Sequence, residues 1–210
     1  MANLLAEVDK FRSWAITNPS TGRYGEWECD YMEWAALHDA VLKFVANRPF
    51  DAWSRTECAQ VLYAIARDNE IQYLSREIRK RHPELLQPLA RAALDIGERD
   101  DRWQLAVELR YLGAESEVLL LEMTRDENEY VRRHALESLL RIGSPAAEEV
   151  AMAAWHRPDA EQQWSRMMAL YCLHHMASPQ LEGLLAQAEV DEREFLREYA
   201  IRIRRGEPPD

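Results

Sequence analysis

Apolar residues recur along most of this chain at the spacing of one face of an α-helix. In one clear segment, Val131, Ala135 and Leu139 form an apolar stripe, and charged residues take the opposite face. Gly143 and Pro145 then end that helix, because glycine favours a helix C-cap and proline follows it. No stretch alternates apolar and polar residues over the length of a strand. The pattern therefore predicts an all-α fold.

The helical pattern also repeats. Four alanines hold equivalent places in similar segments and are 29, 34 and 31 residues apart: Ala106, Ala135, Ala169 and Ala200. This spacing fits two antiparallel helices of about 12 residues each with short turns. A small residue at each place allows adjacent helices to approach closely, so the repeat has a packing reason.

One repeat carries a more specific signature. It consists of Asp126, the Val131-Arg132 pair, Ala135, Leu139 and Gly143. This pattern resembles the HEAT repeat, and degenerate copies occupy residues 102–113, 164–177 and 195–206. The resemblance covers roughly half of the chain. It implies a HEAT-like α-solenoid of about five antiparallel helical hairpins, a fold that usually holds another macromolecule.

The repeats predict a single α-solenoid domain over residues 1–210. Residues 56–210 form the hairpins, the first of them from a helix at 56–67 and another at 71–81. Residues 1–55 differ from the repeats in their sequence pattern. We expect an N-terminal helical cap there, because an end repeat must cover its open face.

The net charge of the chain limits the class of macromolecule that it can bind. The chain has 26 basic and 37 acidic residues, a net charge of -11. This argues against nucleic acid as a partner, since Lys and Arg supply most of that affinity, and favours a protein with a basic surface. No apolar run reaches the roughly 20 residues of a membrane span or the form of a signal peptide. Three scattered cysteines fit a reducing compartment, so we expect a cytoplasmic protein; the oligomeric state is left open.

Motifs for chemistry are missing from the sequence. There is no metal-binding His or Cys pattern, no nucleophile motif and no glycine-rich phosphate loop. The His38-Asp39 pair resembles the central dipeptide of HD phosphohydrolases, but no histidine precedes it, and we interpret the histidines as surface or capping residues. The sequence thus predicts no catalytic residue, no metal, no cofactor and no enzyme.

Acidic residues gather in the turn inside each hairpin. Stacking would align these turns as an acidic ladder along one rim of the solenoid, although helix capping alone also explains one or two acids per turn. The predicted partner-binding acids of the ladder are Asp100, Asp101, Asp126, Glu127 and Glu129.

A second candidate is the segment 24–34, where aromatic residues alternate with acids. Its acids Glu26, Glu28 and Asp30 are predicted to face solvent and bind a partner. Trp27, Tyr31 and Trp34 follow the i, i+4, i+7 spacing of a helical core stripe, so we expect them in the core.

These features predict a non-catalytic protein-binding module. Small acidic helical-repeat proteins of this kind resemble immunity proteins of bacterial contact-dependent or polymorphic toxin systems. The resemblance implies an inhibitor that covers the basic active site of a nuclease toxin with an acidic surface. Two alternatives remain: an adaptor or scaffold for a protein complex, and a HEAT-like enzyme related to glycosylases or lyases.

Overall fold

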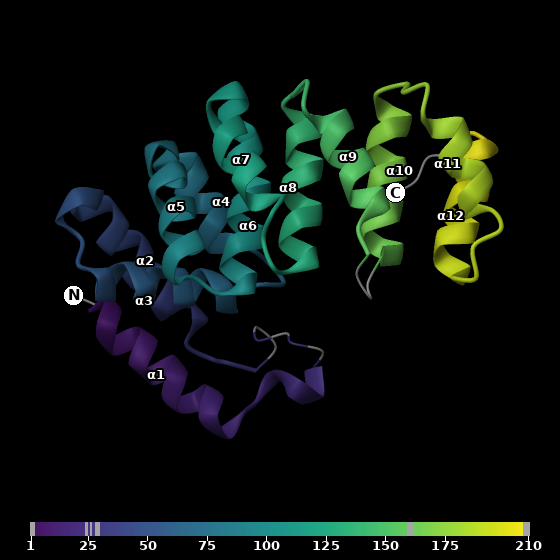
Figure 1. Ribbon diagram of the computed structural model, residues 1–210. Coiled ribbons are helices and arrows are strands. Elements are labelled where there is room, and N and C mark those ends of the chain that lie inside the picture. Colours follow the sequence, from purple (N-terminus) through teal and green to yellow (C-terminus); the bar gives the residue numbers. More distant parts are fainter. Residues whose placement is uncertain (1–2, 24, 26, 28–29, 159–161, 208–210) are drawn as a thin grey trace. The chain divides into compact units, whose positions relative to one another are not determined.

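The computed structural model describes residues 3–23, 25, 27, 30–158 and 162–207. Those residues form helices and turns without a strand, which confirms the predicted all-α fold (Figure 1). They divide into two compact units, Met1–Leu112 and Gly113–Asp210. The single domain with a cap at residues 1–55 stays a prediction.

The first unit contains the helices that precede the clearest repeats. These are α1 (Leu4–Thr17), η1 (Ser20–Arg23), α2 (Trp34–Asn47), η2 (Phe50–Ala52), α3 (Arg55–Arg67), α4 (Tyr73–Arg81), η3 (Pro83–Leu85), α5 (Leu86–Ile96) and α6 (Arg99–Leu109), with η4 (Arg110–Ser116) following. The expected 56–81 hairpin is not a closely packed pair, because α3 packs mainly on α6 and α1, and α4 on α2 and α6. The chain changes direction between α3 and α4, where Gln72 has a left-handed φ of 54°.

The aromatic residues of the first unit surround the fully buried Phe11 of α1. The ring centroids of Tyr31 and Trp34 lie 4.8 and 5.0 Å from that of Phe11, and the Trp27 centroid lies at 5.9 Å. Tyr31 is buried, and both tryptophans are half-buried. The core position predicted for this trio is confirmed for Tyr31, whereas Trp27 and Trp34 pack against Phe11 but stay partly exposed. The helical stripe was wrong, because α2 begins only at Trp34 and the other two rings reach Phe11 from a turn.

The second unit consists of three helical hairpins. They are formed by α7 (Glu117–Met123) with α8 (Glu129–Arg141), α9 (Ala147–His156) with α10 (Gln162–His175), and α11 (Leu181–Ala188) with α12 (Glu194–Arg204), drawn as successive pairs in Figure 1. The second helices α8, α10 and α12 pack side by side, and their alanines Ala135, Ala169 and Ala200 are fully buried. Among the described residues of both units, none of the helices has the length and apolar character needed to cross a bilayer.

Arginines three residues before the buried alanines hold the hairpin turns. Arg132 Nη1 donates to the carbonyl oxygens of Asp126 and Glu127 at 2.9 and 2.7 Å. Arg197 Nη1 donates to the Asp191 carbonyl at 2.9 Å in the same way. At the equivalent place in the middle hairpin, Arg166 donates to the Trp155 carbonyl and to Asp191 Oδ2, at 3.1 and 3.2 Å. It therefore connects the second and third hairpins.

Serines close the open ends of two hairpins. Ser144 Oγ donates to Glu117 Oε1, and Ser178 Oγ donates to Glu148 Oε1, each at 2.5 Å. Each bond joins the end of a second helix to the start of its own first helix. The preceding residues Gly143 and Ala177 have left-handed φ values of 70° and 51°. Glycine adopts this conformation without strain, whereas alanine at the second site does not.

Gly97, between α5 and α6, is required for a steric reason rather than for its φ. A Cβ atom there would lie 2.3 Å from Asp101 Oδ1 and 2.6 Å from the Ala93 carbonyl oxygen. The second contact is with helix backbone, which has little freedom to move. By contrast, a Cβ atom at Gly183 in α11 would meet no atom within 4 Å.

We predict opposite effects of the same substitution at these two glycines. Gly97→Ala should lower the free energy of unfolding by about 1–3 kcal/mol, because the new methyl group overpacks the α5–α6 junction. Gly183→Ala should raise it by about 0.5–1 kcal/mol, because alanine favours an exposed helix interior. Urea unfolding followed by circular dichroism measures both. A Gly97→Ala protein as stable as wild type would contradict the close approach.

Candidate partner-binding site

The acids predicted in the first unit differ in their access to solvent. Asp100 is half-buried, and its carboxylate accepts hydrogen bonds from Arg99 Nε at 2.7 Å and Trp103 Nε1 at 3.2 Å. Asp101 has no exposed surface, and its Oδ2 accepts from the Glu98 backbone N–H at 2.7 Å, near the start of α6. The prediction that Asp101 faces a partner is therefore corrected: this carboxyl caps a helix from inside the unit.

Most acids of the turn before α8 also bond to other residues of the same chain. Asp126 Oδ1 accepts from the Asn128 backbone N–H at 2.8 Å. Glu129 is 6% exposed and lies 3.2 Å from Arg133 Nε, so it too is turned inward. Glu127 is the exposed member of the three. Capping and internal ion pairs thus account for much of the acid in this turn.

The acids of the segment 24–34 are only partly described. Asp30 is exposed, as expected. Glu26 and Glu28 lie outside the described residues. Partner binding by the acidic ladder and by the segment 24–34 stays a prediction. Among the described candidates, Asp30 and Glu127 are the exposed acids.

The second unit carries a row of exposed aromatic side chains that was not predicted from the sequence. Tyr130, Trp164 and Phe195 each stand five residues before a buried alanine, near the starts of α8, α10 and α12. They are 38%, 36% and 55% exposed. Because the three helices pack side by side in one register, the rings fall into line; we call these three residues the aromatic row. The repeat spacing contained this signal.

Contacts within the row make it one surface. The rings of Trp164 and Phe195 stack with centroids 5.7 Å apart and an interplanar angle of 26°. The Arg133 guanidinium lies 4.7 Å from the Tyr130 ring centroid and 6.0 Å from that of Trp164. Cation–π attraction at these distances holds the arginine between the two rings.

A cavity of about 530 Å³ opens beside the aromatic row. Trp164 and Arg133 belong to its wall, together with Tyr171, Tyr199 and Arg141 from further along α10, α12 and α8. The pKa of Tyr199 is raised, chiefly by burial, so its phenol stays neutral near pH 7. The row and cavity together present tryptophan, tyrosine and arginine, the residue types that dominate the energetics of protein interfaces.

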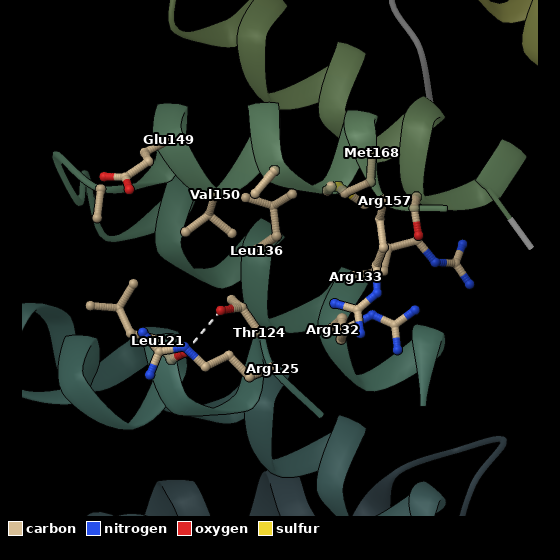
Figure 2. Close-up of a pocket in the computed structure, with 14 residues that line it drawn as sticks. Leu121, Thr124, Arg125, Arg132, Arg133, Leu136, Glu149, Val150, Arg157 and Met168 are labelled. Atoms are coloured by element: carbon tan, nitrogen blue, oxygen red, sulfur yellow. Dashed lines mark hydrogen bonds between the residues drawn. The ribbon is translucent and has the colours of Figure 1, made fainter. Parts of the chain in front are cut away.

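A second cavity, of about 400 Å³, lies between the α7–α8 and α9–α10 hairpins (Figure 2). Four arginines line it, Arg125, Arg132, Arg133 and Arg157, against one carboxylate from Glu149. We call it the arginine pocket. No sequence signal marked it, because its charges come from the α7–α8 turn, from α8, and from α9 and the residue that follows it.

The His38-Asp39 dipeptide, which resembles a phosphohydrolase motif, does not form a catalytic arrangement. His38 Nε2 lies 3.7 Å from Asp68 Oδ1, and its ring stacks on Tyr73 at 4.8 Å. Burial lowers the pKa of His38 to about 4, so the ring is neutral near pH 7. Asp39, the other half of the dipeptide, instead pairs with Lys43 at 2.6 Å. This geometry indicates a packing role for the histidine.

The two cysteines within the described residues, Cys58 and Cys172, are both buried. Burial raises the pKa of the Cys58 thiol to about 11 and that of Cys172 to about 12, so neither is a thiolate near pH 7. Within the described ranges, no three His, Cys, Asp or Glu side chains are grouped so that they could hold a metal ion.

Comparison with known proteins identifies the repeats. Residues 116–203 match the family model of HEAT repeats. The match covers the three hairpins of the second unit. It therefore includes the aromatic row, the cavity beside the row and the arginine pocket. No curated protein and no solved structure matches the chain. HEAT repeats indicate a protein-binding or scaffold role, and proteins built from them are generally non-catalytic scaffolds.

We predict that the buried Asp101 makes the stability of the protein depend on pH. Desolvation raises its pKa to about 8 from an ordinary 3.8, so the unfolded chain releases this proton first and stability falls as the pH rises from about 4 to 8. His38, with its pKa lowered from 6.5, acts with the opposite sign below pH 6.5. The window from pH 6.5 to 8 therefore isolates Asp101.

In that window, wild type should lose about 1 kcal/mol of unfolding free energy per pH unit relative to Asp101→Asn. Urea unfolding at several pH values measures the difference. Asp100→Asn is the matched control and should keep the wild-type slope. Equal slopes for wild type and Asp101→Asn would contradict the assignment of this pH dependence to Asp101.

We also predict that two neighbouring acids of the α8 turn behave differently. Asp126→Ala should cost about 1 kcal/mol of stability, because the Asn128 N–H loses its acceptor. Glu127→Ala should change stability by less than about 0.5 kcal/mol, as expected for an exposed side chain. Thermal unfolding of the two variants compares them, and equal destabilisation would contradict the role of Asp126 in holding the turn before α8.

Proposed function

We propose that this protein is a non-catalytic protein-binding module whose second unit holds its partner on the aromatic row. The observation that carries the proposal is that one repeat position supplies an exposed aromatic ring in all three hairpins. Large apolar side chains normally lie inside, and contiguous exposed ones mark interaction surfaces. Buried in an interface, each ring would contribute a large apolar area.

The surroundings of the aromatic row favour a basic partner. Glu127, Glu192 and Glu194 are exposed in the turns next to the row or at the first residue of α12. Aromatic faces attract guanidinium and ammonium groups, and these carboxylates would pair with them. The net charge of -11 would also steer a basic partner to the protein before contact.

Among basic partners, we propose the nuclease domain of a bacterial toxin, with this protein as its immunity protein. Support comes from the acidic charge and from the demand that a nuclease cleft be basic in order to bind phosphates. An adaptor role in a complex is the second candidate, favoured by the HEAT-repeat match alone. An inhibitor predicts one tight partner and loss of its nuclease activity, whereas an adaptor predicts several partners and no inhibition.

The test uses the protein as bait in a pull-down from its source cell, followed by titration of each captured partner. Phe195→Ala and Trp164→Ala should each weaken partner binding by about tenfold or more. The double variant Val118→Ala and Val190→Ala is the control, since it removes exposed apolar side chains of the same unit that lie off the row. Its affinity should match wild type.

Two results would count against the proposal. If the partner binds both aromatic variants as tightly as wild type, the row is not the binding surface. If a captured basic nuclease keeps full activity at saturating protein, the inhibitor role fails for that partner while the binding role stands.

A further inference from the structure

Two of the rings in the wall of the cavity beside the aromatic row already face a guanidinium group of this chain. The guanidinium carbon of Arg133 lies 6.0 Å from the Trp164 ring centroid, and that of Arg141 lies 5.7 Å from the Tyr171 centroid. Ring faces attract cations over distances of up to about 6 Å. A cationic side chain that entered the cavity would therefore meet two like charges at these rings.

The same two guanidinium groups have carboxylate partners within the chain. Arg133 Nε lies 3.2 Å from Glu129 Oε1, and Arg141 Nη2 lies 3.5 Å from Glu137 Oε1. Arg141 Nη2 also donates to the Tyr171 hydroxyl. An anionic side chain in the cavity would compete with these carboxylates for the arginines. The charges of the wall thus favour an occupant without charge.

The rest of the wall favours an aromatic occupant over an aliphatic one. Its remaining lining residues are thioether and aromatic side chains: Met167, Met168 and Tyr199. Aromatic rings attract one another beyond the area that they bury, methionine sulfur contacts ring edges favourably, and a planar guanidinium stacks on a ring face. The volume of about 530 Å³ lies within the range of about 300–1,000 Å³ common to ligand sites.

We propose that the cavity beside the aromatic row receives one uncharged aromatic side chain of the protein partner as an anchor. This inference rests on the proposed function, because it names the side chain that the partner inserts next to Trp164. Basic residues of the partner pair instead with exposed acids outside the cavity lining, such as Glu192 and Glu194. The partner segment therefore carries an aromatic residue among basic ones.

The experiment follows the methionine methyl groups of the full-length protein by NMR while capped amino acids are added. Met167 is the reporter, assigned through Met167→Leu, because it lines this cavity alone of the two, whereas Met168 also lines the arginine pocket. The probes are N-acetyl-tryptophanamide for a ring, N-acetyl-leucinamide for an aliphatic side chain and N-acetyl-argininamide for a cation. Their caps are identical and neutral, so only the side chain differs.

We expect the Met167 methyl signal to shift saturably with the tryptophan probe, with a Kd of about 5 mM or tighter. The leucine probe should bind about fivefold more weakly, because it makes no ring contacts. The arginine probe should not bind saturably by about 20 mM. The methyl signal of Met32, which is 93% exposed, should stay unchanged in all three titrations.

A pair of matched charge variants tests the role of the guanidinium groups. Arg141→Gln removes the cation at the Tyr171 ring and the partner that it gives to Glu137. The arginine probe should now shift Met167 saturably, and the tryptophan probe should bind about threefold more weakly for lack of a stacking group. Arg205→Gln changes the net charge equally at an exposed residue outside the cavity lining and should behave as wild type. Unaltered melting temperatures show that both variants are folded.

Tighter binding of the tryptophan probe than of the other two supports the aromatic anchor. The proposal is overturned if Met167 does not shift by about 20 mM tryptophan probe, if the leucine or arginine probe binds wild type equally well, or if Arg141→Gln and Arg205→Gln behave alike. The proposed function fails separately. A cavity that binds no probe leaves the test of the aromatic row by Phe195→Ala unaffected, whereas a partner indifferent to Phe195→Ala leaves the probe titrations unaffected.

Discussion

The second unit depends on the close approach of three helices through small residues at one register position. Ala135, Ala169 and Ala200 are fully buried where α8, α10 and α12 meet. Because the helices are held at that register, every other position of the repeat is also aligned across them. The exposed rings of the aromatic row line up because of this constraint, whereas the turn-holding arginines and the serines recur at fixed places within the hairpins.

Most of the fold could be predicted from the sequence, because the helical pattern depends on local spacing. The buried alanines and the Gly143-Ser144-Pro145 helix end were visible as a repeat. The packing of the first unit was less predictable. Trp27 and Tyr31 reach Phe11 from a turn, a contact between distant segments that no helical spacing encodes.

The candidate site was harder to predict, since a residue type does not reveal its burial. Asp101 and Glu127 look alike in the sequence, yet one is sealed inside the first unit and the other is exposed. The rings of Tyr130, Trp164 and Phe195 were present in the repeats, but only their exposure shows that they are not core. The arginine pocket combines side chains from two hairpins, so only the three-dimensional arrangement reveals its charge.

Arg166 has a consequence for how the second unit comes apart. A row of hairpins that contact only their neighbours tends to unfold from its end, one repeat at a time. The Arg166 side chain bonds the Trp155 carbonyl in the second hairpin and Asp191 in the third, whose pKa is lowered to about 2 by its arginine partners, Arg193 first. Detaching the last hairpin breaks this ion pair together with the packing of α12 on α10. Loss of the C-terminal hairpin therefore also changes the second hairpin, where water must replace the carboxylate at Arg166.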